Sequence, residues 1–267
     1  MPPVWCNGAF MAEDEVRISI ADRGFTLADG IFETLRAAGN TPLWLAEHLD
    51  RLRVSAQFLG LLVSYDDADI EAAIVRLLGD NGFAESAVRI TLTRGPASKR
   101  GLWSSDNPDH PTLLITAAVA GKMPPQHMVM CRSTRRNECS PLSGIKSLNY
   151  GDNILARREA IQRGASDALM LNTRGHVACA TVGNVFLRID DKWVTPMLSD
   201  GILPGIARAK IIPALDAIER TLPEQDIAQA DAAFISNSLG CTSIASIEGR
   251  TLQQSALPDL AIYQKSH

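Results

Sequence analysis

The sequence lacks several features that would assign it to a broad class of protein. It has no basic excess, because 26 Lys and Arg residues stand against 30 Asp and Glu residues, which gives a formal net charge of −4. Proteins that bind a phosphate backbone usually carry basic residues clustered on one face. The charge balance therefore argues against nucleic acid and favours a small molecule or another protein as the partner.

Long apolar runs are also missing. The longest, residues 113–120, includes Thr116 and is far shorter than the roughly 20 residues that a membrane-spanning helix needs. The N-terminal residues become acidic where a signal peptide would be apolar. We therefore expect no membrane association and no secretion.

Motifs of metal and hydrolase sites are missing as well. The five cysteines are odd in number and never form a C-x-x-C pair, and the five histidines are scattered, so we expect no metal. The segment at Gly144 lacks the glycine-rich start of a phosphate-binding P-loop. Few, unpaired cysteines are typical of a reducing compartment, and we expect a cytoplasmic location.

The composition, with 46% apolar and 21% charged residues, is that of a globular chain with a core. Helical spacing of apolar residues predicts helices over 46–62 and 66–78. Alternation then predicts a strand over 88–93, with Arg89, Thr91 and Thr93 on one face, and a more buried strand over 113–119. A turn-rich stretch follows at 121–126, so we place a domain boundary there, between residues 1–120 and 121–267.

The second half continues to alternate between helices and mainly hairpin-linked strands. Turn residues and periodicity predict helices at 152–162 and 205–218, the latter bent at Pro213, and strands at 168–171, 176–180, 185–189, 192–195, 232–236 and 243–247. Helices combined with hairpin-linked strands indicate an α+β fold rather than a doubly wound parallel sheet.

Lys146 is the candidate for chemistry that the residues themselves suggest. It lies at a predicted loop-to-helix junction between the apolar residues Ile145 and Leu148. A lysine desolvated in such a place has a lowered pKa and becomes a nucleophilic amine. The alternative is an ordinary exposed lysine at the start of a helix.

The chain resembles the class IV aminotransferases, a family that includes branched-chain and D-amino-acid aminotransferases and 4-amino-4-deoxychorismate lyase. The resemblance rests on motifs that occur in the family's order over nearly the whole chain. They are DRGFTLADGIFETLR (22–36), EHLDRL (47–52), TRGPASKRGL (93–102), GIKSLNY (144–150), VGNVF (182–186), PGIAR (204–208) and FISNSL (234–239).

The resemblance implies a fold-type IV enzyme that depends on pyridoxal 5'-phosphate (PLP). It would have a small N-terminal α/β sandwich domain over 1–120, a larger C-terminal pseudo-barrel domain over 121–267, and the cofactor at their interface. A homodimer is also implied, with the partner subunit closing the active site. Lys146 corresponds to the lysine that holds the cofactor as a Schiff base and moves the proton at the substrate carbon.

Further cofactor contacts follow from the same resemblance. Arg51 matches the arginine that binds the PLP phosphate, although an ion pair with Glu47 at i,i+4 is the alternative. The turn that opens the helix at 205 would complete the phosphate site with backbone amides. The remaining matches are Gly205, Ile206, Ala207, Asn237 and Ser238 near the phosphate, Leu203 against the pyridine ring and Tyr150 near its phenolic oxygen.

Cys179 departs from the family pattern. It lies five residues before Asn184, where family members carry the Glu that pairs with the protonated pyridine nitrogen, and no acid occurs between Arg174 and Asp190 to replace it. A thiol supports a cationic ring less well than a carboxylate. The alternative is that Cys179 is simply a small buried residue.

Substrate contacts are expected from Phe32 and from Arg89, Arg94 and Arg100, because an arginine suits a substrate carboxylate. Each arginine could instead be a solvated charge, and Phe32 could be a core residue. The expected substrate is a small amine that bears a carboxylate.

Elimination of a good leaving group makes a smaller demand on the electron sink than transamination does. The absence of a glutamate at position 179 therefore favours a lyase. We therefore expect a 4-amino-4-deoxychorismate lyase that forms 4-aminobenzoate and pyruvate. The alternative is an aminotransferase acting on branched-chain or D-amino acids. A third hypothesis is a homologue that binds PLP with little turnover because of Cys179.

Overall fold

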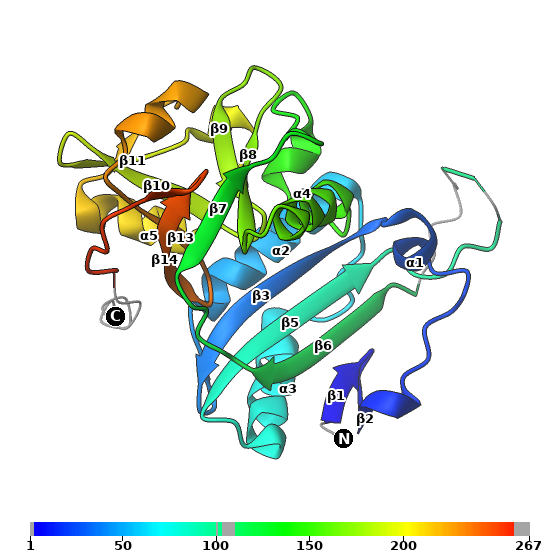
Figure 1. The fold of residues 1–267 in the computed structure, drawn as a ribbon. Helices are drawn as coiled ribbons and strands as arrows, with labels where there is room; N and C mark the ends of the chain where they lie inside the picture. Colours follow the sequence, from blue (N-terminus) through cyan, green and yellow to red (C-terminus); the bar gives the residue numbers. More distant parts are fainter. Residues whose placement is uncertain (1–2, 100, 103–109, 259–267) are drawn as a thin grey trace. The chain divides into compact units, whose positions relative to one another are not determined.

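The computed structural model describes residues 3–99, 101–102 and 110–258. The chain packs as two compact units (Figure 1). The first comprises Met1–Gly121 together with Lys146–Asn149, and the second comprises Lys122–Ile145 and Tyr150–His267. The short segment that contains Lys146 therefore packs with the N-terminal residues although it lies far along the chain.

An antiparallel sheet forms the centre of the first unit. Its strand order is β2-β1-β6-β5-β3-β4. The strands are β1 (Pro3–Cys6), β2 (Ala9–Ala12), β3 (Gly30–Ala38), β4 (Thr41–Pro42), β5 (Glu85–Thr93) and β6 (Thr112–Val119). In β5 the alternation is as predicted, because Val88, Ile90 and Leu92 are fully buried while Arg89 is exposed.

The helices of this unit are α1 (Arg23–Leu27), α2 (Leu45–Leu59) and α3 (Asp67–Asn81). The two long helices confirm the helical periodicity. Helix α2 packs on β3, and α3 packs on β1 and β6. Helix α3 begins where the side chain of Asp66 accepts a hydrogen bond from Asp69 N and ends at Gly82, whose φ of +64° suits glycine.

Strand β3 was not predicted from the sequence. Its apolar pattern is interrupted by Glu33, which lies among the buried residues Ile31, Leu35 and Ala37 on the face that alternation assigns to the core. A charged residue at a core position hides the alternation on which strand prediction depends. The same glutamate is part of the candidate site described below.

The second unit is built on a mixed sheet with the order β12-β11-β10-β13-β14-β7-β8-β9, and β15 pairs with β14. Strands β9 and β10 are separated by a short turn in sequence but by four strands in this order, so the sheet curls back on itself. The elements are β7 (Gln126–Met130), α4 (Gly151–Gln162), β8 (Asp167–Leu171), β9 (Val177–Ala180), β10 (Asn184–Ile189), β11 (Lys192–Thr195), α5 (Ile206–Leu215), β12 (Ile218–Glu219), β13 (Ala232–Asn237), β14 (Gly240–Ile247) and β15 (Arg250–Thr251).

The α+β architecture predicted from the sequence is confirmed. In the second unit, strands β7, β12 and β15 were not predicted, and one helix ends earlier than predicted. Helix α5 ends at Leu215, not at residue 218, because Asp216 adopts a left-handed conformation with φ of +49°. Ile218 then pairs with Val194 of β11. Within the described residues, no helix is both long and apolar enough to cross a membrane.

Candidate active site

Lys146 lies on an extended segment that adds to the edge of β3. Phe32 N donates a hydrogen bond to Lys146 O, and Leu148 N donates one to Gly30 O, each at 2.9 Å. Strand β4 pairs only with the far end of β3, at Ala37 and Ala38, which leaves this part of the edge for the segment. The backbone of Lys146 is therefore fixed by strand pairing before α4 begins, and not by the helix itself.

The side chain of Lys146 is partly buried, and its Nζ lies 4.4 Å from the centroid of the Phe32 ring. Burial lowers the pKa of Lys146 to about 8; the nearby Glu33 carboxylate opposes this, and the Arg51 and Arg89 guanidinium groups add to it. An amine with this pKa has a much larger neutral fraction near neutral pH than an ordinary lysine. Its surroundings thus suit a nucleophile.

A second cationic side chain, that of Arg89, lies over the Phe32 ring. The Cζ atom of Arg89 lies 3.8 Å from the ring centroid, and its Nε donates to Thr91 Oγ1 at 3.1 Å. Phe32 is 6% exposed. Phe32 therefore serves as a common surface for Arg89 and Lys146, which the structure brings together from β5 and from the segment beside β3.

Arg51 is held by a carboxylate that the sequence analysis did not single out. Its Nε donates to Glu33 Oε1 and its Nη2 to Glu33 Oε2, each at 2.7 Å. His48 Nδ1 lies 2.7 Å from the same Oε2. The signal that could have revealed this group is a glutamate within a strand, followed by a histidine and an arginine three residues apart on a helix.

Arg94 is committed to the scaffold. Its Nε donates to Asp29 Oδ2 at 2.8 Å, and its other nitrogens donate to Asp29 Oδ1 and to the carbonyl oxygens of Leu59 and Gly60. It thereby ties the end of α2 to the turn before β3. Arg100 lies outside the described residues.

Cys179 lies on β9 in the second unit and is 8% exposed. It packs in an apolar cluster with Val129, Ala168, Met170 and Ile202. Burial raises the pKa of its thiol; the Arg136 guanidinium opposes this effect, and the Asp167 carboxylate adds to it. Cys179 is consequently a neutral thiol at physiological pH and not an anion.

The start of α5 is a tight turn beside β10. Asn184 Nδ2 donates to Leu203 O at 3.0 Å, and a Cβ on Gly205 would lie 2.1 Å from Asn184 Oδ1, so only glycine fits there. Ile206 and Ala207 open the helix. Their backbone N–H groups precede the first intrahelical bond, and such groups favour an anion.

The remaining predicted residues of this unit lie at ends of elements. Asn237 ends β13, where its Nδ2 donates to Val182 O at 3.2 Å and its Oδ1 accepts from Leu239 N at 2.9 Å. Ser238 follows in the turn to β14, and Tyr150 is the residue before α4. Among the described residues, no group of His, Cys, Asp and Glu side chains could hold a metal ion.

The sequence model of the family described as amino-transferase class IV matches residues 30–247. D-alanine aminotransferase of Bacillus licheniformis is 25% identical to this chain over 265 residues, which cover 94% of this chain and 90% of that protein.

Solved structures show the same likeness. A Legionella pneumophila protein, whose name proposes that it is a 4-amino-4-deoxychorismate lyase, is 30% identical, with a TM-score of 0.83 and 95% of each chain covered. Branched-chain aminotransferase of Thermoproteus uzoniensis, solved with norvaline, is 28% identical, with a TM-score of 0.84 and coverage of 98% of this chain and 91% of that one. The predicted fold-type IV architecture is confirmed by these structures. Because the family model matches most of its length, the chain belongs to the class IV aminotransferases and is an enzyme of that family.

Proposed function

We propose that this enzyme is a 4-amino-4-deoxychorismate lyase, which forms 4-aminobenzoate and pyruvate. Class IV aminotransferases use PLP, so the predicted cofactor is confirmed at the level of the family. The bound cofactor supplies an aldehyde for the substrate amine and a ring that stabilises negative charge at the adjacent carbon.

The residues present fit such a cofactor. An aldehyde reacts with the neutral form of an amine, and burial lowers the pKa of Lys146 to about 8, which raises the neutral fraction near neutral pH. A phosphate needs backbone N–H groups that it can approach closely, and the turn at Gly205 has no room for a Cβ atom. A guanidinium fixed in orientation, that of Arg51, suits the same phosphate.

The proposed roles follow from these properties. Lys146 holds the cofactor and, once released, moves the proton at the substrate carbon. From the family resemblance we propose Arg51, Gly205, Ile206, Ala207, Asn237 and Ser238 for the phosphate, Leu203 and Tyr150 for the ring and its phenolic oxygen, and Cys179 for the pyridine nitrogen. Phe32 and Arg89 are proposed to contact the substrate, with Arg89 binding a carboxylate. Arg94 is left out because Asp29 and two backbone carbonyls occupy its guanidinium.

The observation that carries the lyase proposal is the neutral, buried thiol of Cys179. A carboxylate at this position would keep the pyridine nitrogen protonated, whereas a thiol gives weaker support to the positive charge. Elimination of a good leaving group tolerates a weaker electron sink than transamination does. The likeness to the Legionella pneumophila protein adds support for the same reaction.

A direct test supplies the purified, PLP-loaded enzyme with 4-amino-4-deoxychorismate and measures 4-aminobenzoate by fluorescence and pyruvate by a coupled assay. We expect both products in equal amounts. Borohydride treatment should attach the cofactor to the peptide that contains Lys146. Formation of the products without this adduct would contradict the role of Lys146. Formation of the adduct without the products would contradict the proposed substrate.

An aminotransferase is the second candidate, and the likeness to D-alanine and branched-chain aminotransferases is the observation that favours it. An amino acid alone should then convert the enzyme to the pyridoxamine form, and a keto acid should restore the original absorbance. A panel of D-alanine and L-branched-chain amino acids distinguishes the two candidates. A homologue with little turnover would give neither response.

We also propose a homodimer. Val54 and Phe58, one turn apart on α2, are 67% and 57% exposed, and Leu62 beyond the helix is 51% exposed. Exposed apolar side chains gathered in this way are typical of surfaces that bind another chain. Light scattering during size-exclusion chromatography should give twice the mass of the chain, and Phe58→Glu should reduce that mass to one chain. The cytoplasmic location stays a prediction.

A further inference from the structure

Glu33 is a buried carboxylate with both oxygens occupied. It is 1% exposed, and its neighbours on the same face of β3 are Ile31 and Leu35. A charge in such a place is destabilising unless it is paired and hydrogen-bonded. Oε1 accepts from Arg51, and Oε2 accepts from both Arg51 and His48. The group is therefore satisfied, and it is oriented from two directions.

His48 is a fixed donor to this carboxylate. Its ring is fully buried, and among the described residues no hydrogen-bonding group meets Nε2. An ionised carboxylate only accepts hydrogen bonds, so His48 donates from Nδ1 to Glu33.

Arg51 receives its orientation from Glu33. Two parallel hydrogen bonds of 2.7 Å fix both the position and the plane of the guanidinium. His48 and Arg51 are three residues apart on α2, so they lie on one face of the helix, against the strand that carries Glu33. An arginine held by a single bond would keep several rotamers of its long side chain.

We propose that Glu33 and His48 are positioning residues, which hold the guanidinium of Arg51 in the one orientation that binds the phosphate of the cofactor. This inference rests on the proposed role of Arg51. Although burial raises the pKa of Glu33, the hydrogen bonds from His48 and Arg51 keep it below its usual value, so the carboxylate stays ionised at working pH. The positioning pair is thus preserved across the physiological range.

The experiment measures dissociation constants of the apoenzyme for PLP and for pyridoxal, which lacks the phosphate. The variants are Glu33→Gln, His48→Leu and His48→Asn, whose side-chain amide can replace the Nδ1–H donor. Arg51→Ala tests the underlying assignment. Glu85→Gln is the matched control. Glu85 of β5 also pairs with an arginine, Arg36, at 2.8 Å; Arg36 lies on β3 as Glu33 does, but this ion pair is more exposed.

We expect Glu33→Gln and His48→Leu to weaken PLP binding by about 10- to 100-fold, the effect of a lost charge-assisted hydrogen bond. Pyridoxal binding should change much less, His48→Asn should recover most of the PLP affinity, and Glu85→Gln should bind both ligands as the wild type does. The double variant Glu33→Gln, Arg51→Ala should bind PLP no more weakly than Arg51→Ala alone.

Equal losses for PLP and pyridoxal would show that the pair only stabilises the fold, and no loss for either would overturn the proposal as well. Failure of the proposed function looks different. In that case the wild type takes up no PLP, or Arg51→Ala weakens PLP and pyridoxal alike, whatever the Glu33 variants do. His48→Asn keeps the test usable if Glu33→Gln does not fold.

Discussion

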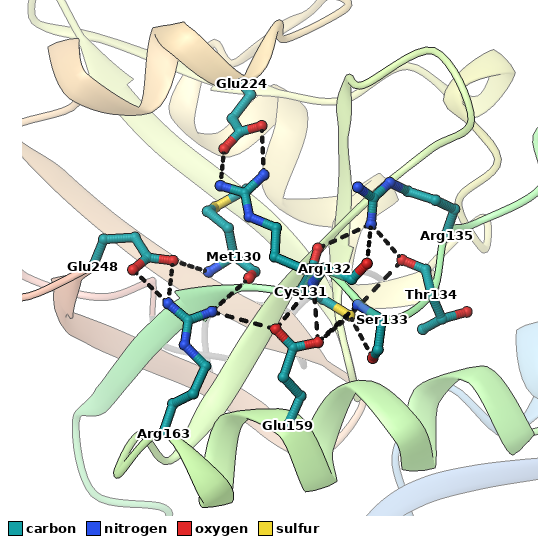
Figure 2. Close-up of polar contacts among 10 residues, drawn as sticks. All are labelled: Met130, Cys131, Arg132, Ser133, Thr134, Arg135, Glu159, Arg163, Glu224 and Glu248. Carbon is teal, nitrogen blue, oxygen red and sulfur yellow. Dashed lines mark hydrogen bonds and ion pairs between the residues drawn. The ribbon is translucent and has the colours of Figure 1, made fainter.

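Glu159 of α4 accepts the backbone N–H of Arg132 with both of its carboxylate oxygens, each at 3.0 Å (Figure 2). Ser133 N donates to the same carboxylate at 2.9 Å, and Arg163 pairs with it at 3.3 Å. Figure 2 shows Arg163, the residue after α4, bonded also to Glu248 and to Met130 O. Glu159 and Arg163 thereby tie the end of α4 to the end of β7 and to the residue that follows β14. We call Glu159 and Arg163 the clamp. The backbone of Arg132 and Ser133 that it holds begins the loop that leads to Lys146.

The clamp predicts how stability depends on pH. Burial opposes ionisation of Glu159, but hydrogen bonds from Ser133, Arg132 and Cys131 lower its pKa to about 2. A carboxyl group whose pKa is lower in the folded chain stabilises the fold above its unfolded value of about 4.5, and this contribution disappears as the pH falls towards 2. Glu159→Gln should cost about 1–3 kcal/mol at pH 7 and progressively less below pH 4.5.

Urea denaturation of wild type and variant at pH 7 and pH 3 checks this. Glu71→Gln, at an exposed position of α3, is the control and should change little at either pH. If the free energies of unfolding of wild type and Glu159→Gln differ by the same amount at both pH values, the stabilisation does not come from ionised Glu159.

Lys146 should react with amine reagents at a lower pH than an ordinary lysine. In the apoenzyme its labelling by a small acylating reagent should reach half of its maximal rate near pH 8, since burial lowers the pKa to about 8. Glu33→Gln should shift this midpoint downward, because the Glu33 charge opposes the effect of burial. Mass spectrometry of the labelled peptide gives the rate, with the exposed Lys122 as internal reference for reagent consumption. A midpoint above pH 10 would contradict the desolvated lysine.

Cys179→Glu should change which reaction the enzyme performs. A carboxylate in place of the neutral thiol would favour a protonated pyridine nitrogen, so we expect transamination to rise by about tenfold or more, within the range that an added charged interaction provides. The measurement is the rate at which an amino acid alone converts the absorbance of the bound cofactor. A variant that folds, binds PLP and loses both activities would show that the thiol does not determine the reaction.

Gly205→Ala tests the turn at the start of α5. The added Cβ would lie 2.1 Å from Asn184 Oδ1, which must move and release Leu203 O. We expect a loss of about 1–3 kcal/mol in stability and weaker PLP binding. Gly121→Ala, where a Cβ meets nothing within 4 Å, should bind PLP as the wild type does. Unchanged affinity in Gly205→Ala would remove this turn from the cofactor site.

Arg94→Lys separates structure from substrate binding. Because Arg94 bonds with Asp29 and two backbone carbonyls, the change should lower stability by about 1–3 kcal/mol with little effect on KM. Thermal unfolding and steady-state kinetics check this together. A raised KM at unchanged stability would instead support the substrate contact expected from the sequence.

The sequence by itself determined the family, because the motifs around Lys146, Arg51 and Asn184 occur in a fixed order that does not depend on how the chain packs. It also determined the two long helices and strands β5 and β6 of the first unit, and most helices and strands of the second, since the periodicity of apolar residues is local. The clearest case is β5, where Val88, Ile90 and Leu92 alternate with polar residues and are all fully buried. The existence of α2 and α3 followed from the same local rule, but α2 ends at Leu59 and not at residue 62, because Gly60 adopts a φ of +63°.

Only the tertiary structure decided which charges meet. Glu33, His48 and Arg51 come from a strand and a helix, and their ion pair exists because α2 packs on β3, a contact that no local pattern specifies. The same packing buries Glu33 and so hid β3 from a prediction based on alternation. Arg94 looked available for a substrate until the fold brought Asp29 and the end of α2 around it. Long-range pairing, set by how whole elements bury their apolar faces, fixes the partners of a charge, whereas local sequence fixes only its place along an element.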